Sequence, residues 1–457
     1  MTHPCHSERS EESLASRPSG LASRQGEQGF LTAFGMTLVL VVASTALGQQ
    51  PPCDVFCHSR LAREAEAARD YAQFETHVRN VAALAPSHPG VVYQMARAFA
   101  LRGAPDSAVA WLTRLGRMGD TRDPDADSVF APLRSRPSYA DARNRLLANR
   151  LPMLAGTRAF ELDDPDFVPE AIAYDSTRRR FLAGSLSKRL VAAVAPNGAT
   201  SAFIPHEPEM LRVVGIHVDA PRSRLWFATW APDTSARADS TEPPSITRLF
   251  LADLATGRIA RSWVPDAGRR GHLLNDFVVM TDGSLFLTDT ERGWIYRLRS
   301  PTDTLEVFLE PPPGRFSTAN GITTTPDGRT LYVAFLEGLA RVDVATREIA
   351  LLPAPDSVST ATIDGLYWYR GSLIAVQATP ERVVRYELSA DGRRIVSGAV
   401  VERGYPDVRQ PTTGVIVGSR FYYIANSQYG RLDDRGGPLA PQSGTPVRTA
   451  IRVIELR

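Results

Sequence analysis

The chain has 457 residues, a hydrophobic share of 43% and a formal net charge of +2. This length predicts two or three domains with a substantial core. The near-neutral charge excludes bulk attraction to nucleic acid or to an anionic membrane surface, so we expect no nucleic-acid partner.

Residues 1–48 are interpreted as a disordered leader followed by a signal peptide. The first 35 residues are rich in Ser, Glu and Arg without periodicity, which indicates disorder or a start site misassigned upstream of Met36. About eleven apolar residues then precede Ala46-Leu47-Gly48, a small-x-small cleavage pattern. This run is short for a membrane span, so we expect an exported protein, periplasmic or secreted, without a stable span. An uncleaved anchor beginning at Phe30 is the alternative, because no Lys or Arg follows Met36 directly.

Cys53 and Cys57 are the two cysteines of the expected mature chain. Their spacing of four residues suits a disulfide on a helix in an exported protein. A metal pair that includes the adjacent His58 is the alternative, although further ligands are missing. We favour the disulfide.

Residues 53–150 predict an all-α domain, because Ala, Arg and Leu recur there with helical periodicity. A closing helix is expected near residues 139–148. The apolar positions repeat after 34 residues, which resembles two tetratricopeptide repeats and implies either a protein partner or packing against a neighbouring domain. The first set is Leu61, Ala62, Ala65, Phe74, Val78 and Val81, and the second is Met95, Ala96, Phe99, Ala108, Leu112 and Leu115.

Residues 156–457 repeat one pattern six times: a short strand, a polar turn and an apolar return strand. The clearest copy spans residues 317–334, where Pro326-Asp327-Gly328 forms the turn between strands at 322–325 and 331–333. The spacings between the copies are 44, 61, 45, 44 and 49 residues, which is typical of a six-bladed β-propeller. The first strands begin at Glu170, Val214, Asn275, Asn320, Asp364 and Thr413.

Two further segments bear on how the propeller is completed. Residues 157–162 and 449–456 are strand-like and lie at its two ends, so we expect them to pair in the last blade and leave no open edge. The insertion at 231–245 is rich in Pro, Asp and Ser, and we expect it to loop over one face of the channel.

The six positions where the first strands begin should form a ring, because the innermost strand of each blade lines the channel. Four of them, Glu170, Asn275, Asn320 and Asp364, offer hard oxygen atoms, and the two carboxylates would neutralise a divalent cation. Such ligands suit Ca²⁺ or a similar hard divalent ion. Turn capping by Asn and Asp explains any one of these residues equally well, but four at one repeat position favour a metal site.

At these residues the chain resembles the SMP-30/gluconolactonase/luciferin-regenerating-enzyme family. The motifs are PEAIAYD around Glu170, NDFVVMTDG from Asn275, ANGITTTPDG around Asn320 and IDGLYW around Asp364. The resemblance implies a six-bladed propeller with one metal held by these four residues. Strictosidine-synthase-like and paraoxonase-like hydrolases share this layout, but Val214 stands where a paraoxonase-like protein would carry a His.

The resemblance implies a metal-dependent hydrolase of lactones or esters, in which Asp364 acts as both ligand and general base. His272 precedes Asn275 by three residues and is a second candidate base; His217 is a third, although strand alternation turns it away from Val214 unless a bulge intervenes. The competing hypothesis is a non-catalytic propeller with a structural ion, which serves with the helical repeats as a binding platform. Serine-hydrolase and nucleotide motifs are not evident.

Overall fold

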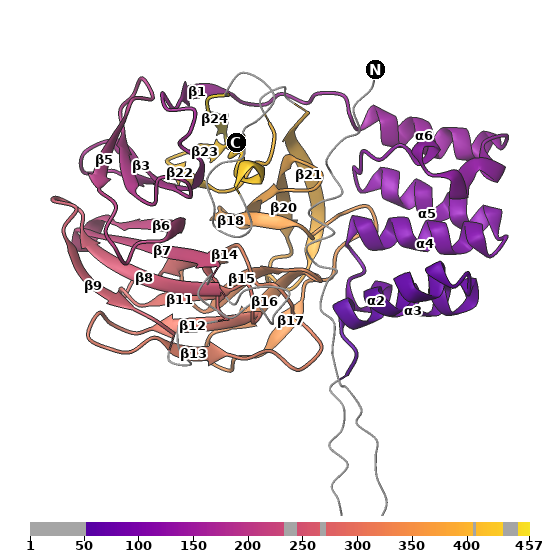
Figure 1. Cartoon of the computed structure of the whole chain (residues 1–457), viewed down its shortest axis with the longest axis horizontal. Coiled ribbons are helices and arrows are strands. Elements are labelled where there is room, and N and C mark those ends of the chain that lie inside the picture. Colours follow the sequence, from indigo (N-terminus) through magenta and orange to yellow (C-terminus); the bar gives the residue numbers. More distant parts are fainter. Residues whose placement is uncertain (1–51, 233–244, 266–270, 405–407, 433–446) are drawn as a thin grey trace, which may run out of the picture.

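Helices and strands occupy separate parts of the chain, with a helical layer beside a ring of β-sheets (Figure 1). The computed structural model describes residues 52–232, 245–265, 271–404, 408–432 and 447–457. The leader at 1–48 and most of the insertion at 231–245 lie outside these residues. Within the described ranges, no helix is long and apolar enough to cross a membrane.

The helical layer has the repeat that the sequence predicts, because α4 begins 34 residues after α2, and α5 begins 34 residues after α3. The side chains of Asp54 and Asp70 accept backbone N–H bonds at the starts of α2 and α3, and a proline opens α4, α5 and α6. The α-helices are α2 (Val55–Ala67), α3 (Tyr71–Leu84), α4 (Pro89–Leu101), α5 (Pro105–Arg117) and α6 (Pro137–Ala148), with short 3₁₀ turns η1 (Pro124–Ala126) and η2 (Ser128–Leu133) before α6.

The strands form six antiparallel sheets of four strands each, so the six-bladed propeller is confirmed. The first three blades are β2 (Pro169–Asp175), β3 (Arg180–Ser185), β4 (Val191–Val194) and β5 (Thr200–Ile204); β6 (Arg212–Asp219), β7 (Arg224–Pro232), β8 (Ser245–Asp253) and β9 (Ile259–Trp263); and β10 (Leu274–Val279), β11 (Leu285–Asp289), β12 (Trp294–Leu298) and β13 (Glu306–Leu309).

The remaining blades complete the circle. They are β14 (Ile322–Thr324), β15 (Thr330–Phe335), β16 (Gly338–Asp343) and β17 (Ile349–Leu351); β18 (Ile363–Tyr369), β19 (Ser372–Gln377), β20 (Arg382–Leu388) and β21 (Ile395–Arg403); and β22 (Gly414–Val417), β23 (Arg420–Ile424), β24 (Ala450–Glu455) and β1 (Thr157–Glu161).

The last blade joins the two ends of the propeller, as the sequence predicts, because β1 pairs antiparallel with β24. The hydrophobic core consists of layers between neighbouring blades. One layer joins Phe286 of the third blade to Val333 of the fourth, and another joins Tyr332 of the fourth to Leu373 of the fifth. Return strands such as β11, β15 and β19 therefore bury side chains on both faces, which explains why they are continuous apolar runs.

The helical layer packs against the fourth and fifth blades through polar contacts. Arg382 of β20 is only 2% exposed and donates from Nη1 to the carbonyls of Met118 and Gly119, at 2.9 and 3.3 Å. The Ser87 and Thr360 hydroxyls lie 2.6 Å apart across the same interface. The helical layer therefore packs against the propeller of the same chain. Packing against a neighbouring domain was one of the two roles expected for the helical repeats, beside binding of a protein partner.

Candidate metal centre

The ring positions coincide with interruptions of the inner strands. The β2–β3 pairing shifts register around Glu170 and the β6–β7 pairing around Val214, while β10 and β18 shift around Asn275 and Asp364. In the other two blades the ring residue precedes the strand: Thr413 lies directly before β22, and Asn320 lies two residues before β14. A bulge breaks the strict alternation of side chains, and it is a common device for turning a side chain toward a site. The register shifts thus give these positions a local freedom that a regular strand would not have.

Glycines after the ring positions let the inner strands approach one another. A Cβ at Gly321 would lie 2.4 Å from the backbone oxygen of Asp364, and one at Gly215 would lie 2.3 Å from that of Asn275. Both distances are shorter than any ordinary contact. A side chain at either position would therefore push neighbouring blades apart at the ring.

Contacts between blades bring several ring residues together. The Asn320 amide donates from Nδ2 to Oδ1 of Asp364 at 3.1 Å. The Thr413 hydroxyl donates to the backbone carbonyl of Glu170 at 2.8 Å, and the Glu170 and Asp364 carboxylates are close enough to repel each other. Asn275 is linked more indirectly, since its Nδ2 donates to Thr290 Oγ1 at 3.0 Å. That hydroxyl donates to the carbonyl of Ala319, the residue before Asn320.

Two oxygen atoms of this ring are buried without a partner among the described residues: Oε2 of Glu170 and Oδ1 of Asn320. Each side chain is partly exposed as a whole, but these atoms are not. A buried oxygen without a hydrogen bond is costly, and each of these two side chains interacts with Asp364, so the two oxygens fit a cation site. Both are hard donors of the kind that Ca²⁺ prefers.

The donor set contains two carboxylates and two amides. Accordingly, no cluster of three or more His, Cys, Asp and Glu side chains suited to a metal ion occurs in the described part of the chain. Amide oxygens would therefore contribute to a cation site at the ring, which is compatible with Ca²⁺ and unfavourable for softer ions.

Burial and mutual repulsion disfavour charge on the ring carboxylates when no cation is present. Burial, followed by the nearby Asp364 carboxylate, raises the pKa of Glu170 well above its usual value. Burial also raises the pKa of Asp364 to about 6, although the Asn320 hydrogen bond opposes this shift. A divalent cation bound at the ring would oppose both shifts, because it favours the charged form of each carboxylate.

Asp276 is a ring residue that sequence reasoning missed. It shares the β10 bulge with Asn275, and its carboxylate accepts from the backbone N–H groups of Phe277 and Ile322, at 2.8 and 3.3 Å. Burial raises its pKa to about 7. The available signal was the Asn-Asp pair at one ring position, because a two-residue bulge can direct both side chains inward.

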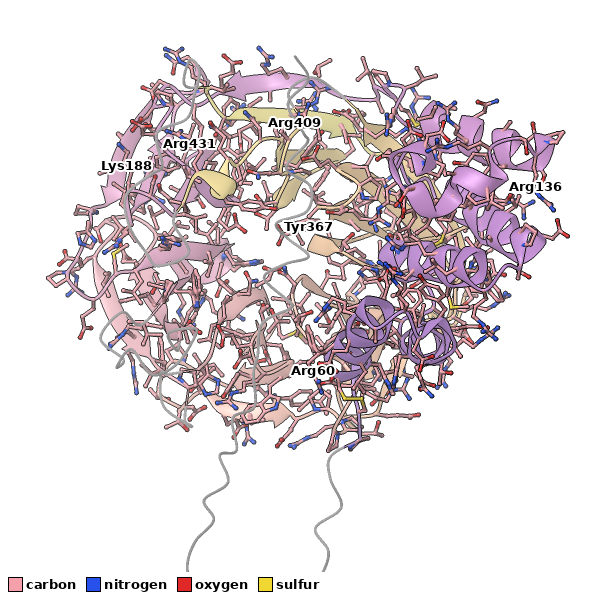
Figure 2. The ribbon with its side chains drawn as sticks, turned by 45° about the vertical axis from the view of Figure 1, so that its right-hand side comes forward. Arg60, Arg136, Lys188, Tyr367, Arg409 and Arg431 are labelled. Atoms are coloured by element: carbon pink, nitrogen blue, oxygen red, sulfur yellow. A yellow bond between two sulfur atoms is a disulfide. The ribbon has the colours of Figure 1, made fainter. Side chains whose placement is uncertain are left out.

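Two tyrosines also lie near the ring carboxylates and were not predicted. The Tyr367 side chain lies toward the centre of the propeller (Figure 2), and its hydroxyl accepts from the Gly414 N–H at 2.6 Å. Burial raises the pKa of Tyr429, and the Asp364 and Glu170 carboxylates add to this shift. Each tyrosine brings a polar hydroxyl near the ring carboxylates, while the rest of its side chain is apolar.

The structure places His272 in the core. It is 1% exposed, and its Nδ1 lies 2.6 Å from Oδ2 of Asp289, a carboxylate that also accepts backbone N–H bonds from the following loop. The His272 ring packs beside those of Trp294 and Tyr296. These contacts describe a structural pair, and a direct role for His272 as a base stays a prediction.

His217 lies farther along β6, beyond the bulge at Val214 that breaks the alternation. Its ring lies 6.2 Å from that of Phe277, and burial lowers its pKa to about 4. It is therefore neutral near pH 7. Among the described residues, no hydrogen bond or ion pair joins His217 to the four candidate ligands.

A surface hollow of about 560 Å³ lies away from the ring, on the outer strands of the third and fourth blades. It is lined by residues 309–313 and 347–349. We assign the chemistry to the ring, because none of the orphaned buried polar atoms of the described residues belongs to the lining of the hollow.

No known family model matches the sequence, and no curated protein matches it. Solved structures with a similar fold include a gluconolactonase from Xanthomonas campestris, with 16% identity and a TM-score of 0.44 over 66% of this chain and 89% of that one. A PQQ-bound aldose sugar dehydrogenase from Streptomyces coelicolor has 12% identity and a TM-score of 0.42, over 66% and 99% of the two chains.

A virginiamycin B lyase from Staphylococcus aureus, in complex with quinupristin, has 12% identity and a TM-score of 0.42 over 65% of this chain and 98% of that one. At these identities and scores the likeness concerns the fold alone. The chain is thus a six-bladed β-propeller preceded by a helical layer.

Proposed function

We propose that the chain is an exported, metal-dependent hydrolase that acts on lactones or esters at the propeller ring. The observation that carries this proposal is the pair of orphaned buried oxygens on Glu170 and Asn320, beside the Asp364 carboxylate. Glu170, Asn275, Asn320 and Asp364 would hold the cation, and their four oxygen donors with two negative charges suit Ca²⁺. A bound divalent cation would polarise the substrate carbonyl and stabilise negative charge on its oxygen.

Asp364 is the residue best placed to move a proton. Asn320 fixes one of its carboxylate oxygens by a hydrogen bond of 3.1 Å, which orients the other for a water molecule. In hydrolysis the water oxygen bonds to the carbonyl carbon while Asp364 takes a proton from that water. The bond from the carbonyl carbon to the alcohol oxygen then breaks, and the proton passes to the departing alcohol.

Hydrolysis of a panel of lactones and aryl esters, with chelator and after Ca²⁺ is restored, tests the proposal. We expect activity toward at least one class, loss with chelator and recovery with Ca²⁺. Absence of hydrolysis across the panel would contradict the enzyme and favour the binding platform, in which the ion is structural and the helical repeats take a protein partner.

Two variants separate ligand from base. Asn320→Ala removes a neutral ligand, so excess Ca²⁺ should restore much of its activity by mass action. Asp364→Asn keeps an amide oxygen but removes the base, so added Ca²⁺ should restore little. Full recovery of both variants would make Asp364 a ligand only and would shift the search for the base to His272.

Export is supported by the disulfide between Cys53 and Cys57, the pairing that the sequence favours. Disulfides persist in oxidising compartments, and this one lies directly after the expected cleavage site. The mass of the exported chain should correspond to a start near residue 49. A mature chain that begins upstream of Met36 would contradict this assignment.

A further inference from the structure

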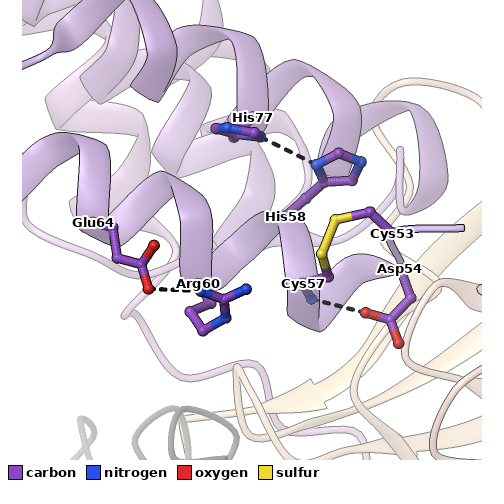
Figure 3. The surroundings of a disulfide bond; sticks show 7 residues. All are labelled: Cys53, Asp54, Cys57, His58, Arg60, Glu64 and His77. Carbon is purple, nitrogen blue, oxygen red and sulfur yellow. Dashed lines mark hydrogen bonds and ion pairs between the residues drawn. A yellow bond between two sulfur atoms is a disulfide. The ribbon is translucent and has the colours of Figure 1, made fainter. Parts of the chain in front are cut away.

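Two histidines face each other in the helical layer, apart from the ring. His58 lies in the first turns of α2 and His77 in the middle of α3, and their Nδ1 atoms are 3.2 Å apart (Figure 3). The centroids of the two imidazoles are 5.4 Å apart, and the imidazole planes are inclined by 37°. Both side chains are half-buried, so water reaches the pair.

The surrounding contacts hold this pair in place. The Cys53–Cys57 disulfide ties the chain before α2 to its first turn, and Asp54 caps the helix by accepting from the Cys57 N–H at 2.8 Å (Figure 3). On the other side of the pair, α2 packs against α3 through buried Ala62, Phe74 and Val78. Both imidazoles are thus positioned by fixed backbone, which reduces the entropy lost when a ligand binds.

The distance between the two nitrogens suits a shared metal ion. Imidazole nitrogens bind Zn²⁺ at about 2.0–2.1 Å, and a tetrahedral angle then separates two of them by about 3.3 Å. The observed 3.2 Å is close to this value. Two neutral rings can meet in this way without metal only if one carries its proton on Nδ1. With metal, that proton moves to Nε2, so binding releases no net proton from two neutral rings.

We propose that His58 and His77 form a second cation site, which takes a borderline divalent ion such as Zn²⁺ or Cu²⁺ through Nδ1 of each ring. Imidazole nitrogens favour these ions, whereas the oxygen donors at the centre of the propeller suit Ca²⁺. The two sites therefore differ in metal class. Because no third His, Cys, Asp or Glu completes a cluster in the described chain, water fills the other positions. The Asp54 carboxylate acts electrostatically on His58 and adds negative charge nearby.

Such an ion would cross-link the first two helices. It would stabilise the helical layer without entering the ring, so this inference does not depend on the proposed hydrolase activity. Loss of Ca²⁺ from the ring should leave Zn²⁺ binding at the histidine pair unchanged.

Zn²⁺ titration of the full chain by calorimetry, with the ring kept saturated by Ca²⁺, tests the proposal. We expect one equivalent of Zn²⁺ to bind, and His58→Gln and His77→Gln each to weaken binding roughly tenfold or more. His206→Gln changes an exposed histidine of the propeller and should bind as the unmodified protein does. Unchanged Zn²⁺ affinity in both pair variants, or no binding by the unmodified chain at millimolar Zn²⁺, would overturn the site.

A second measurement does not depend on how the variants fold. Electron paramagnetic resonance of one equivalent of Cu²⁺ on the unmodified, Ca²⁺-saturated protein should show coupling to two imidazole nitrogens. A spectrum with oxygen ligands only would overturn the proposal, even if some Cu²⁺ is bound.

Discussion

Glu402 and Glu170 are both carboxylates enclosed by the propeller, but only Glu402 has partners for both of its oxygens. Its Oε1 accepts from the Tyr423 hydroxyl at 2.8 Å and from Arg452, and its Oε2 accepts from the Gly156 N–H at 2.6 Å. Oε2 of Glu170 has no partner among the described residues. Glu402 is 0% exposed and Arg452 is 1% exposed.

The difference separates a structural site from a ligand site. The Glu402 cluster joins β21, β23 and β24 to the segment before β1, so it links the fifth blade to the blade that closes the propeller. Its charges neutralise each other within the protein. At the ring, the Glu170 and Asp364 carboxylates repel each other, and Oε2 of Glu170 has no partner among the described residues to offset the cost of its burial.

The largest expected effect is on the partnered site. Glu402→Gln leaves the Arg452 guanidinium buried without its counter-charge, and we expect the free energy of unfolding to fall by about 3–5 kcal/mol. Chemical denaturation measures this change. Glu455→Gln is the matched control, because the Arg420–Glu455 pair is exposed to solvent and should contribute little to stability. Equal losses in the two variants would contradict the role assigned to the closing cluster.

Glu170→Gln should behave in the opposite way. In chelator it removes the repulsion with Asp364, so the free energy of unfolding should stay constant or rise. In the unmodified protein, Ca²⁺ at 100 times its dissociation constant should add about 2.7 kcal/mol, and the variant should lose most of this gain. Thermal unfolding with and without Ca²⁺ measures both effects. A variant that is destabilised in chelator would place Glu170 among the structural carboxylates.

A smaller effect on stability is expected at His88. Its hydrogen-bond partner is a backbone N–H, which only the neutral imidazole can accept. Its Nδ1 accepts from the Gly90 N–H at 3.1 Å and so caps α4. Burial, and then Arg122, lowers its pKa to about 4. Between about pH 6.5 and 4 the unfolded chain binds a proton that the folded chain does not, so stability should fall as the pH falls through this range.

We expect the loss of stability at His88 to reach about 1–2 kcal/mol, since partial exposure reduces the full effect of the pKa shift. His88→Asn keeps a cap that does not titrate and should flatten the slope of stability against pH. Unfolding free energies at several pH values provide the measurement. A slope of the same size in the variant would assign the acid sensitivity to another group.

The sequence by itself determined the elements that depend on local chemistry. Turn residues such as Pro326-Asp327-Gly328 fix the hairpins, and the repeat of about 45 residues fixes the number of blades. The 34-residue apolar repeat located both helix pairs, and the apolar ends of the chain predicted the pairing of β1 with β24. The same repeat identified the positions that the structure places at bulges and strand starts around the channel, although their roles as metal ligands stay predictions.

Only the tertiary structure decided which polar groups meet. Asp276 turns inward because of a bulge whose length the sequence does not specify, and Asp289 reaches His272 from the neighbouring strand. Arg382 meets the carbonyl of Met118 across 264 residues, and His58 meets His77 only when α2 packs on α3. Local propensity acts over a few residues, whereas these contacts depend on how whole blades and helices pack, and packing is set by the complete chain.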